Sequence, residues 1–283
     1  MTITHRAERK EFAESLTEVP SFPAVAIKVL QIISNERGQL RELSDLITSD
    51  PAISSAILRM ANSALFGIRT EVCSILQATH MLGQERVKGL VVTIAMKAYL
   101  NGALEIPTLR ACWRHSLACA ISSEEFAKVG LMEADVAYTA GLMHDVGRLA
   151  LVAGYRKQYA DFLAAAEIQP CDALQREREL FGVDHCQVGS LLMSRWKLPK
   201  MIIEVASQHH DVPAAGETKM ITTVRRGCKM ADALGFYAIR PLRPRSYEEI
   251  LAQFPDRERA RLPRESSDFI HHIAGKINAI ECA

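Results

Sequence analysis

The stretch AGLMHDVGRLAL, residues 140–151, places His144 and Asp145 side by side between two apolar runs. Burying a carboxylate costs free energy unless a cation, a strong hydrogen-bond network or a metal ion compensates its charge. The pair therefore predicts a buried polar centre in the middle of the chain.

Two further side chains extend this pair. His115 precedes it and Asp232 follows it, so the possible metal ligands occur in the order H…HD…D. Nitrogen and oxygen ligands together suit Fe, Mn or Ni, and also Zn or Mg with water completing the coordination shell. Such an ion can acidify a bound water and neutralise phosphate charge, the usual route to phosphoester hydrolysis. Alternatively, His115 and Asp145 pair with each other in a helical core, or the ion has a structural role.

Three more histidines are candidates for the same centre: His185, His209 and His210. His185 opens an expected helix and the other two end one, so their side chains can face a shared pocket. Each also has a simpler interpretation. His185 can be a helix-start residue beside Asp184, and the histidine pair can interact with the negative end of a helix dipole.

The apolar pattern predicts an all-α fold. Apolar residues recur at i, i+3, i+4 and i+7 nearly throughout, and aromatic residues make up only 6% of the chain. Asp50 followed by Pro51 is typical of a helix start, and Gly83 of a helix end. We expect five helices before residue 101. Helices are expected over 51–62, 84–100, 108–129, 134–152 with the His–Asp pair inside it or at a break, 155–167, 172–180, 185–196, 199–210 and 218–234.

The loop NGALEIP, residues 101–107, is the best candidate boundary between two halves. Near the other end of the chain, RPLRPRSYEEI (240–250) reads as a basic, proline-containing linker, and RESSDFIHHIAGKINAI (264–280) as an amphipathic helix. Asn62 and Ser63 fall at an expected helix end, where a structural turn is the favoured interpretation.

Composition excludes several classes of protein. The chain has 283 residues, 48% of them apolar, which is ample for a sizeable core. The 34 basic and 33 acidic residues give no long-range attraction to nucleic acid or an anionic membrane. Seven cysteines without a C-x-x-C pair argue against a disulfide framework and a zinc ribbon. The N-terminus lacks a signal-peptide core and LVVTIAMKAYL (90–100) is too short for a bilayer, so a cytoplasmic protein is expected.

From about Val19 to Asp211 the chain resembles the HDOD family, output domains related to HD-type metal-dependent phosphohydrolases. The resemblance implies an all-α fold in which an N-terminal helical subdomain (1–102) packs on an HD-like helical subdomain (103–236), followed by a helical tail (237–283). It also implies a bacterial signal-transduction protein with protein partners in a signalling pathway and a possible small phosphorylated ligand. The matching segments are VPSFPAVAIKVL (19–30), SDPAISSAILRMANSALFG (49–67), WRHS (113–116), GLMHDVGRLAL (141–151), FGVDHCQVGSLLMSRWKLP (181–199) and QHHD (208–211).

The resemblance assigns roles to the candidate residues. His115 matches the first metal histidine of HD proteins, His144 and Asp145 match the HD pair, and Asp232 matches the distal aspartate. One or two divalent ions are therefore implied, because a further set matches positions that hold a second metal in the related HD-GYP enzymes. That set is His185, His209 and His210.

Three departures weigh against catalysis. Ala111 stands where HD-GYP enzymes have a glutamate, Arg148 stands where a lysine is usual, and DVPAAGETK (211–219) stands where the GYP segment would follow. A cyclic di-GMP phosphodiesterase is therefore not expected. The favoured hypothesis is a regulatory, non-catalytic protein with an HD-like pocket for a divalent metal. The alternative is a metal-dependent phosphohydrolase acting on a nucleotide or other phosphoester.

Overall fold

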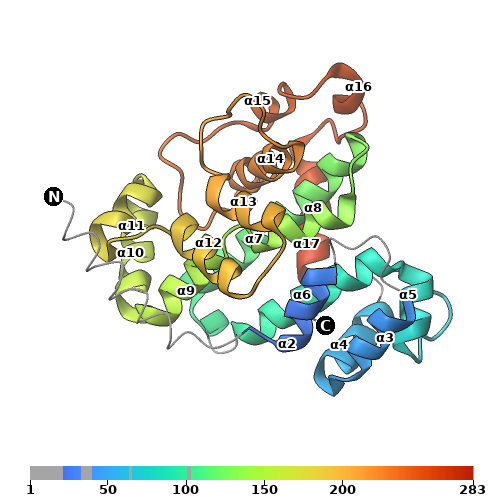
Figure 1. Ribbon diagram of the computed structural model, residues 1–283. Coiled ribbons are helices and arrows are strands. Elements are labelled where there is room, and N and C mark those ends of the chain that lie inside the picture. The colour runs from blue at the N-terminus through green and yellow to red at the C-terminus, as the bar shows by residue number, and fades with distance from the viewer. Residues whose placement is uncertain (1–21, 33–39, 64–65, 101–102, 283) are drawn as a thin grey trace.

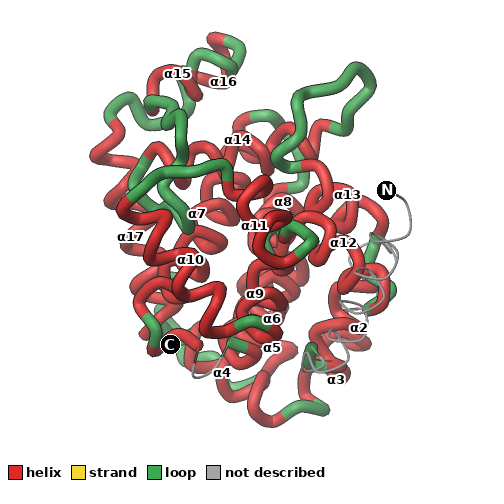
Figure 2. The backbone as a smooth tube through the Cα atoms, turned by 90° about the vertical axis from the view of Figure 1, so that its left-hand side faces the viewer, coloured by secondary structure: helices red, strands yellow, loops and turns green. Residues whose placement is uncertain are grey.

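The computed structural model describes residues 22–32, 40–63, 66–100 and 103–282. These residues form helices and loops and contain no strand, which confirms the all-α prediction (Figure 1, Figure 2). None of the described helices combines the length and apolar character that a membrane span needs. The first 21 residues, and Asn101 and Gly102 at the expected boundary, lie outside the described residues. The domain limits at 102 and 236 stay predictions.

Five helices precede Leu100 in the described part of the chain. Asp50 caps one of them, accepting hydrogen bonds from the amides of Ala52 and Ile53. Asn62 fastens the loop that follows, because its amide side chain accepts from the Val72 amide at 2.8 Å and donates to the Val72 carbonyl at 2.9 Å. The five are α2 (Ala24–Ile32), α3 (Leu40–Thr48), α4 (Pro51–Ala61), α5 (Ile75–Leu82) and α6 (Gln84–Tyr99). In Figure 1, α3, α4 and α5 form a lobe at the lower right.

The second half is arranged around one long helix, α7 (Pro107–Val129), which is buried along most of its length. It packs against α8, α14 and α17, and a short 3-10 turn (Ala103–Glu105) precedes it. The other helices of this half are α8 (Ala134–Met143), α9 (Val146–Gly154), α10 (Arg156–Ile168), α11 (Ala173–Phe181), α12 (His185–Arg195), α13 (Lys200–Gln208) and α14 (Lys219–Ala233).

The His–Asp pair lies at a break between two helices. Helix was expected over 134–152 with the pair inside it or at a break, and the break is present, because α8 ends at Met143 and α9 begins at Val146. His144 and Asp145 form the turn between them, and both are buried. Because this turn lies in the protein interior, the side chains of His144 and Asp145 both face surrounding helices.

The tail is more helical than expected. The linker predicted over 240–250 was wrong in its second half, where Ser246 and Glu249 form a capping box that starts α15 (Tyr247–Leu251). A short helix, α16 (Asp256–Arg259), follows. The predicted amphipathic helix is present as α17 (Ser266–Cys282), and its buried apolar face, which includes Ile273, packs on α7.

A glycine contact sets the distance between α9 and α12. A Cβ atom added to Gly147 would overlap the carbonyl oxygen of His185 and would lie 2.6 Å from the amide nitrogen of Gly189. Only hydrogen fits at this position. Because Gly147 follows Asp145 by two residues, the close approach brings the start of α12 directly to the His–Asp turn.

We expect Gly147→Ala to lower the free energy of unfolding by about 1–3 kcal/mol or more, because the added methyl group forces α9 away from α12. The matched control is Gly275→Ala in α17, where a Cβ atom meets nothing within 4 Å. That change should raise the free energy of unfolding by about 0.5–1 kcal/mol, since alanine favours the helix. Urea unfolding followed by circular dichroism measures both. Equal effects of the two substitutions would contradict the packing argument.

Candidate metal centre

Helix ends bring the predicted ligands together. His144 follows α8, Asp145 precedes α9, His185 is the first residue of α12 and His209 follows α13. His115 alone comes from a helix interior, that of α7. All five side chains are buried. Residues far apart in the sequence therefore share one small volume inside the second half of the chain.

Each of these histidines has one ring nitrogen occupied by a group that can only accept a hydrogen bond. His185 Nδ1 donates to the carboxylate of Glu177 at 2.6 Å. The other three donate Nδ1–H to backbone carbonyl oxygens: His115 to Phe236 at 2.8 Å, His144 to Gly141 at 2.6 Å and His209 to Ala206 at 3.0 Å. In a neutral imidazole held this way, Nε2 carries a lone pair.

The four Nε2 atoms converge on the carboxylate of Asp145. Its Oδ1 lies 3.2 Å from His185 Nε2 and 3.4 Å from His209 Nε2. Its Oδ2 lies 3.6 Å from His144 Nε2 and 3.8 Å from His115 Nε2. Lone pairs that face a carboxylate repel it unless a proton or a metal ion stands between them.

Three of these buried atoms have no hydrogen-bond partner: His144 Nε2, His209 Nε2 and Asp145 Oδ1. A buried polar atom left unpaired costs about 1–3 kcal/mol, so three directed at one point indicate a missing partner. Histidines that donate Nδ1–H to a carbonyl and point Nε2 inward are arranged as metal ligands usually are. The residues present therefore fit a divalent metal ion.

The charge states of His115, His144 and Asp145 agree with this geometry. Burial lowers the pKa of His115 to about 4 and that of His144 well below its ordinary value, so both rings are neutral. Burial opposes ionisation of Asp145, but Arg148 holds its pKa well below the usual range. For His209, burial lowers the pKa, but Cys186 and Asp145 outweigh it and raise the value to about 9. A proton and a metal ion therefore compete for His209 Nε2.

A buried ion-pair network supports the centre from one side. Arg148 Nε donates to Asp145 Oδ2 at 2.6 Å, and its Nη1 donates to Glu177 Oε1 at 3.1 Å. Glu177 also accepts from the Tyr159 hydroxyl at 2.7 Å and from the His185 amide at 2.9 Å. Burial opposes ionisation of Glu177, but His185 and Arg148 lower its pKa to about 2.

Sequence reasoning missed Glu177 and two cysteines of the centre. Glu177 lies in the charged run QRERE (175–179), where nothing distinguishes it from solvent-exposed neighbours. Cys186 Sγ lies 3.9 Å from His209 Nδ1, and Cys228 Sγ lies 3.6 Å from His115 Nε2. Neither thiol was among the predicted ligands. The only signal was that Cys186 directly follows a candidate histidine.

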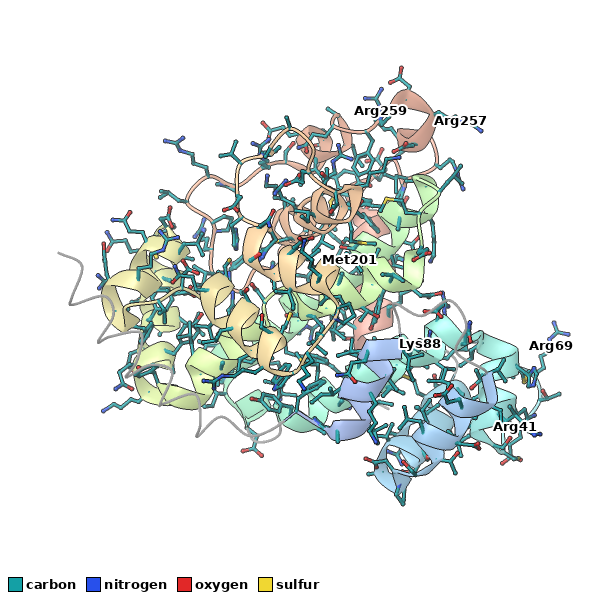
Figure 3. All side chains as sticks on the ribbon, in the orientation of Figure 1. Arg41, Arg69, Lys88, Met201, Arg257 and Arg259 are labelled. Carbon is teal, nitrogen blue, oxygen red and sulfur yellow. The ribbon has the colours of Figure 1, made fainter. Side chains whose placement is uncertain are left out.

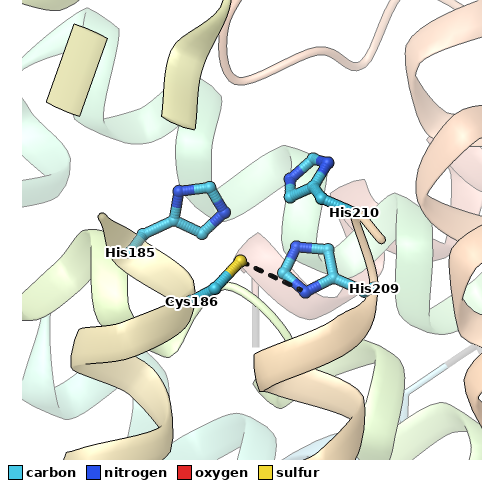
Figure 4. Close-up of side chains that lie close together, drawn as sticks. All are labelled: His185, Cys186, His209 and His210. Carbon is cyan, nitrogen blue, oxygen red and sulfur yellow. Dashed lines mark hydrogen bonds between the residues drawn. The ribbon is translucent and has the colours of Figure 1, made fainter. Parts of the chain in front are cut away.

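His210 joins a second group of possible ligands. Ligand atoms of His185, Cys186, His209 and His210 lie within 4.8 Å of one another, as Figure 4 shows for their side chains. Unlike the other three, His210 is exposed to solvent. It therefore marks the side on which the centre opens.

Asp232 lies outside the converging set. Its Oδ1 is 3.5 Å from His115 Nδ1, the ring nitrogen that faces away from Asp145. Burial raises the pKa of Asp232 to about 8. The structure thus brings together six of the seven residues predicted as ligands and places the seventh behind His115, so that its role as a ligand stays a prediction.

A cleft of about 540 Å³ leads to the centre and is lined by His115, Arg148, His209, His210 and Asp232 together with residues of the tail. This volume lies in the range typical of small-molecule sites. The centre is therefore accessible to a ligand from one side.

Known proteins share this fold. An HDOD domain protein of unknown function from Geobacter sulfurreducens is 23% identical, with a TM-score of 0.75 over 99% of this chain and 97% of its own. A candidate signal transduction protein of Marinobacter aquaeolei VT8 is 18% identical, with a TM-score of 0.73 over 98% of this chain and 65% of its own. A candidate phosphohydrolase of Shewanella amazonensis SB2B is 22% identical, with a TM-score of 0.68 over 95% and 94%. At these identities the likeness concerns the fold.

An uncharacterized protein of Treponema pallidum (strain Nichols) is 24% identical over 221 residues. The alignment covers 75% of this chain but only 42% of that relative. The sequence model of the HDOD domain matches residues 19–212, which is more than half of the chain. The chain therefore belongs to the HDOD family.

Proposed function

We propose that the protein is a signal-transduction regulator whose buried His–Asp centre binds one divalent metal ion without turning over a substrate. The observation that carries the proposal is the convergence of three unpartnered buried atoms, His144 Nε2, His209 Nε2 and Asp145 Oδ1. Bound there, an ion satisfies all three. Two imidazoles and one carboxylate suit Fe, Mn, Ni or Zn better than Mg.

A single ion follows from the position of Arg148. Two ions in one centre would share the carboxylate of Asp145, but Arg148 Nε already lies 2.6 Å from its Oδ2. The same guanidinium reaches to 3.4 Å from His185 Nε2. It therefore supplies a fixed positive charge at the place that a second ion would need.

The same arginine favours regulation over catalysis. A cation that binds phosphate during hydrolysis must be free to contact it, whereas the buried guanidinium of Arg148 pairs with Asp145 and Glu177. Ala111 provides no carboxylate one turn before His115. The likeness of the fold to a candidate signal transduction protein supports the same proposal. We infer that the protein acts through protein partners.

Hydrolysis of a phosphoester is the second candidate function. It is favoured by the cleft, which leads solvent to His210 and the metal centre, and by the likeness of the fold to a candidate phosphohydrolase. When bound, a metal ion would supply an acidified water and neutralise phosphate charge. The two functions differ in turnover, not in metal binding.

Protein purified without chelator should contain one divalent ion per chain, measured by elemental analysis. Removing it should lower Tm by roughly 5–10 °C, since an ion at about 100 times its Kd stabilises by about 2.7 kcal/mol. Asp145→Asn should abolish the metal content, whereas Asp161→Asn, an exposed position on α10, should keep it. A metal-free wild type after loading, or equal metal content in both variants, would contradict the proposal.

Metal-loaded protein should show no turnover above the Asp145→Asn background. A panel of phosphomonoesters, nucleotides and cyclic dinucleotides, assayed for released phosphate and by chromatography in Mn²⁺ and Fe²⁺, provides the measurement. Turnover that is lost in Asp145→Asn and kept in Asp161→Asn would replace regulation by hydrolysis as the function.

Arg148→Met should lower the free energy of unfolding by about 3–5 kcal/mol, because it leaves two buried carboxylates without their cation. The control is Arg176→Met, which removes an exposed ion pair with Glu179 of 2.9 Å and should cost less than about 1 kcal/mol. Adding Glu177→Gln to Arg148→Met should restore part of the loss. Chemical unfolding of the four proteins tests this, and an equal cost of the two arginine substitutions would refute the role of the network.

A further inference from the structure

Positive charge gathers at the mouth of the cleft. Lys229 of α14 and three arginines of the segment 238–245, Arg240, Arg243 and Arg245, line the same cleft as the metal centre. All four lie beyond residue 212, where the match to the family ends. We call these four residues the basic mouth. The basic mouth therefore lies outside the part of the chain that matches the HDOD domain.

Acidic side chains balance the basic mouth only in part. Within the described residues, none of its four side chains forms an ion pair with a carboxylate. Two carboxylates line the cleft with these four cations: Asp172, which caps α11, and Asp232. Because the whole chain carries a net charge of only +1, the mouth is a local concentration of positive charge.

The pKa of Lys229 is lowered in these surroundings. Burial lowers its pKa, and the neighbouring Arg245 and Arg225 lower it further. Like charges held together without an anion repel one another, and an anion placed among them would relieve that repulsion. The mouth is therefore complementary to a negatively charged ligand.

The arginines are carried by an anchored segment. Ile239 is buried in the apolar cluster that contains Tyr159 and Phe162 of α10. Tyr237 donates a hydrogen bond to Glu167 of α10 at 3.4 Å. Figure 1 shows this segment leaving α14 and crossing toward α10 and α11 before it returns to α15. The backbone that bears the arginines is thus fixed at the edge of the cleft.

We infer that the basic mouth recognises the phosphate groups of a small organic molecule that occupies the cleft above the metal centre. Guanidinium groups bind phosphate through paired, charge-assisted hydrogen bonds. Apolar side chains of the same walls, Leu174, Ile239 and Leu242, suit an uncharged part of the molecule such as a base. A nucleoside diphosphate or triphosphate combines these properties. The inference rests on the proposed function for the metal ion at the floor of the cleft.

Calorimetric titration of the full chain tests the inference, with inorganic pyrophosphate and ADP as probes. Chelator-treated protein should bind both probes, ADP more tightly, with an affinity that falls as salt increases. The triple variant Arg240→Gln, Arg243→Gln, Arg245→Gln should bind each probe at least about tenfold more weakly, since it removes three charge-assisted contacts. Reloading the metal should tighten binding by the wild type.

The control is a triple variant with the same change of charge, Arg41→Gln, Arg69→Gln, Arg257→Gln. These arginines are exposed on helices and loops away from the cleft, as Figure 3 shows. The control variant should bind pyrophosphate and ADP as the wild type does. Equal weakening in both triple variants would overturn the inference, because it would reduce the effect to net charge.

Two further results would also overturn it: no binding of either probe by the wild type at millimolar concentration, or displacement of ADP by an oligonucleotide whose affinity grows with its length. Failure of the proposed function has a different signature. In that case metal content is absent while binding of pyrophosphate still depends on the basic mouth. If the protein contains the metal but the triple variant of the basic mouth binds both probes as tightly as the wild type, only the inference about the mouth is wrong.

Discussion

The burial of one carboxylate organises the second half of this protein. Asp145 is 2% exposed, and it holds its negative charge because the guanidinium of Arg148 lies beside it. A buried carboxylate needs charged or polar partners, and those of Asp145 come from several helices. Asp145 lies at the break between α8 and α9, and the ends of α12 and α13 turn toward it. The helix boundaries and the centre are thus one feature of the fold.

Behind the centre, Glu177 holds in place two groups that contact Asp145: the guanidinium of Arg148 and the ring of His185. Glu177 orients His185 by accepting from its ring and its amide, and it is itself neutralised by Arg148. Without a metal ion, the centre holds two negative side chains, Asp145 and Glu177, and one positive side chain, Arg148. It therefore lacks one positive charge for neutrality. A protonated His209 supplies that one charge, and a divalent ion supplies one charge more than is needed for neutrality. The same contacts therefore serve stability and, in our proposal, the choice of a single ion.

The sequence predicted the parts of the centre that carry a local pattern. His144 and Asp145 stood out because polar residues rarely interrupt an apolar run, and helix periodicity located most of the helices. Glu177 and Cys228 could not be found this way, because their burial is decided by which helices meet in space. The start of α15 was missed although Ser246 and Glu249 form a recognisable capping pattern. Prolines on the N-terminal side had favoured a linker throughout.

The centre and the basic mouth come from different parts of the chain, and this has a physical consequence. The converging ligands lie within residues 19–212 and are held by buried hydrogen bonds, so any change there disturbs the fold. The arginines of the mouth are exposed, and Ile239, with Ala238 beside it, ties their segment to a core. Substituting them costs little stability, since exposed side chains outside helices contribute little to it. Substitutions in the tail can therefore change which ligand the cleft binds, while the buried metal centre stays intact.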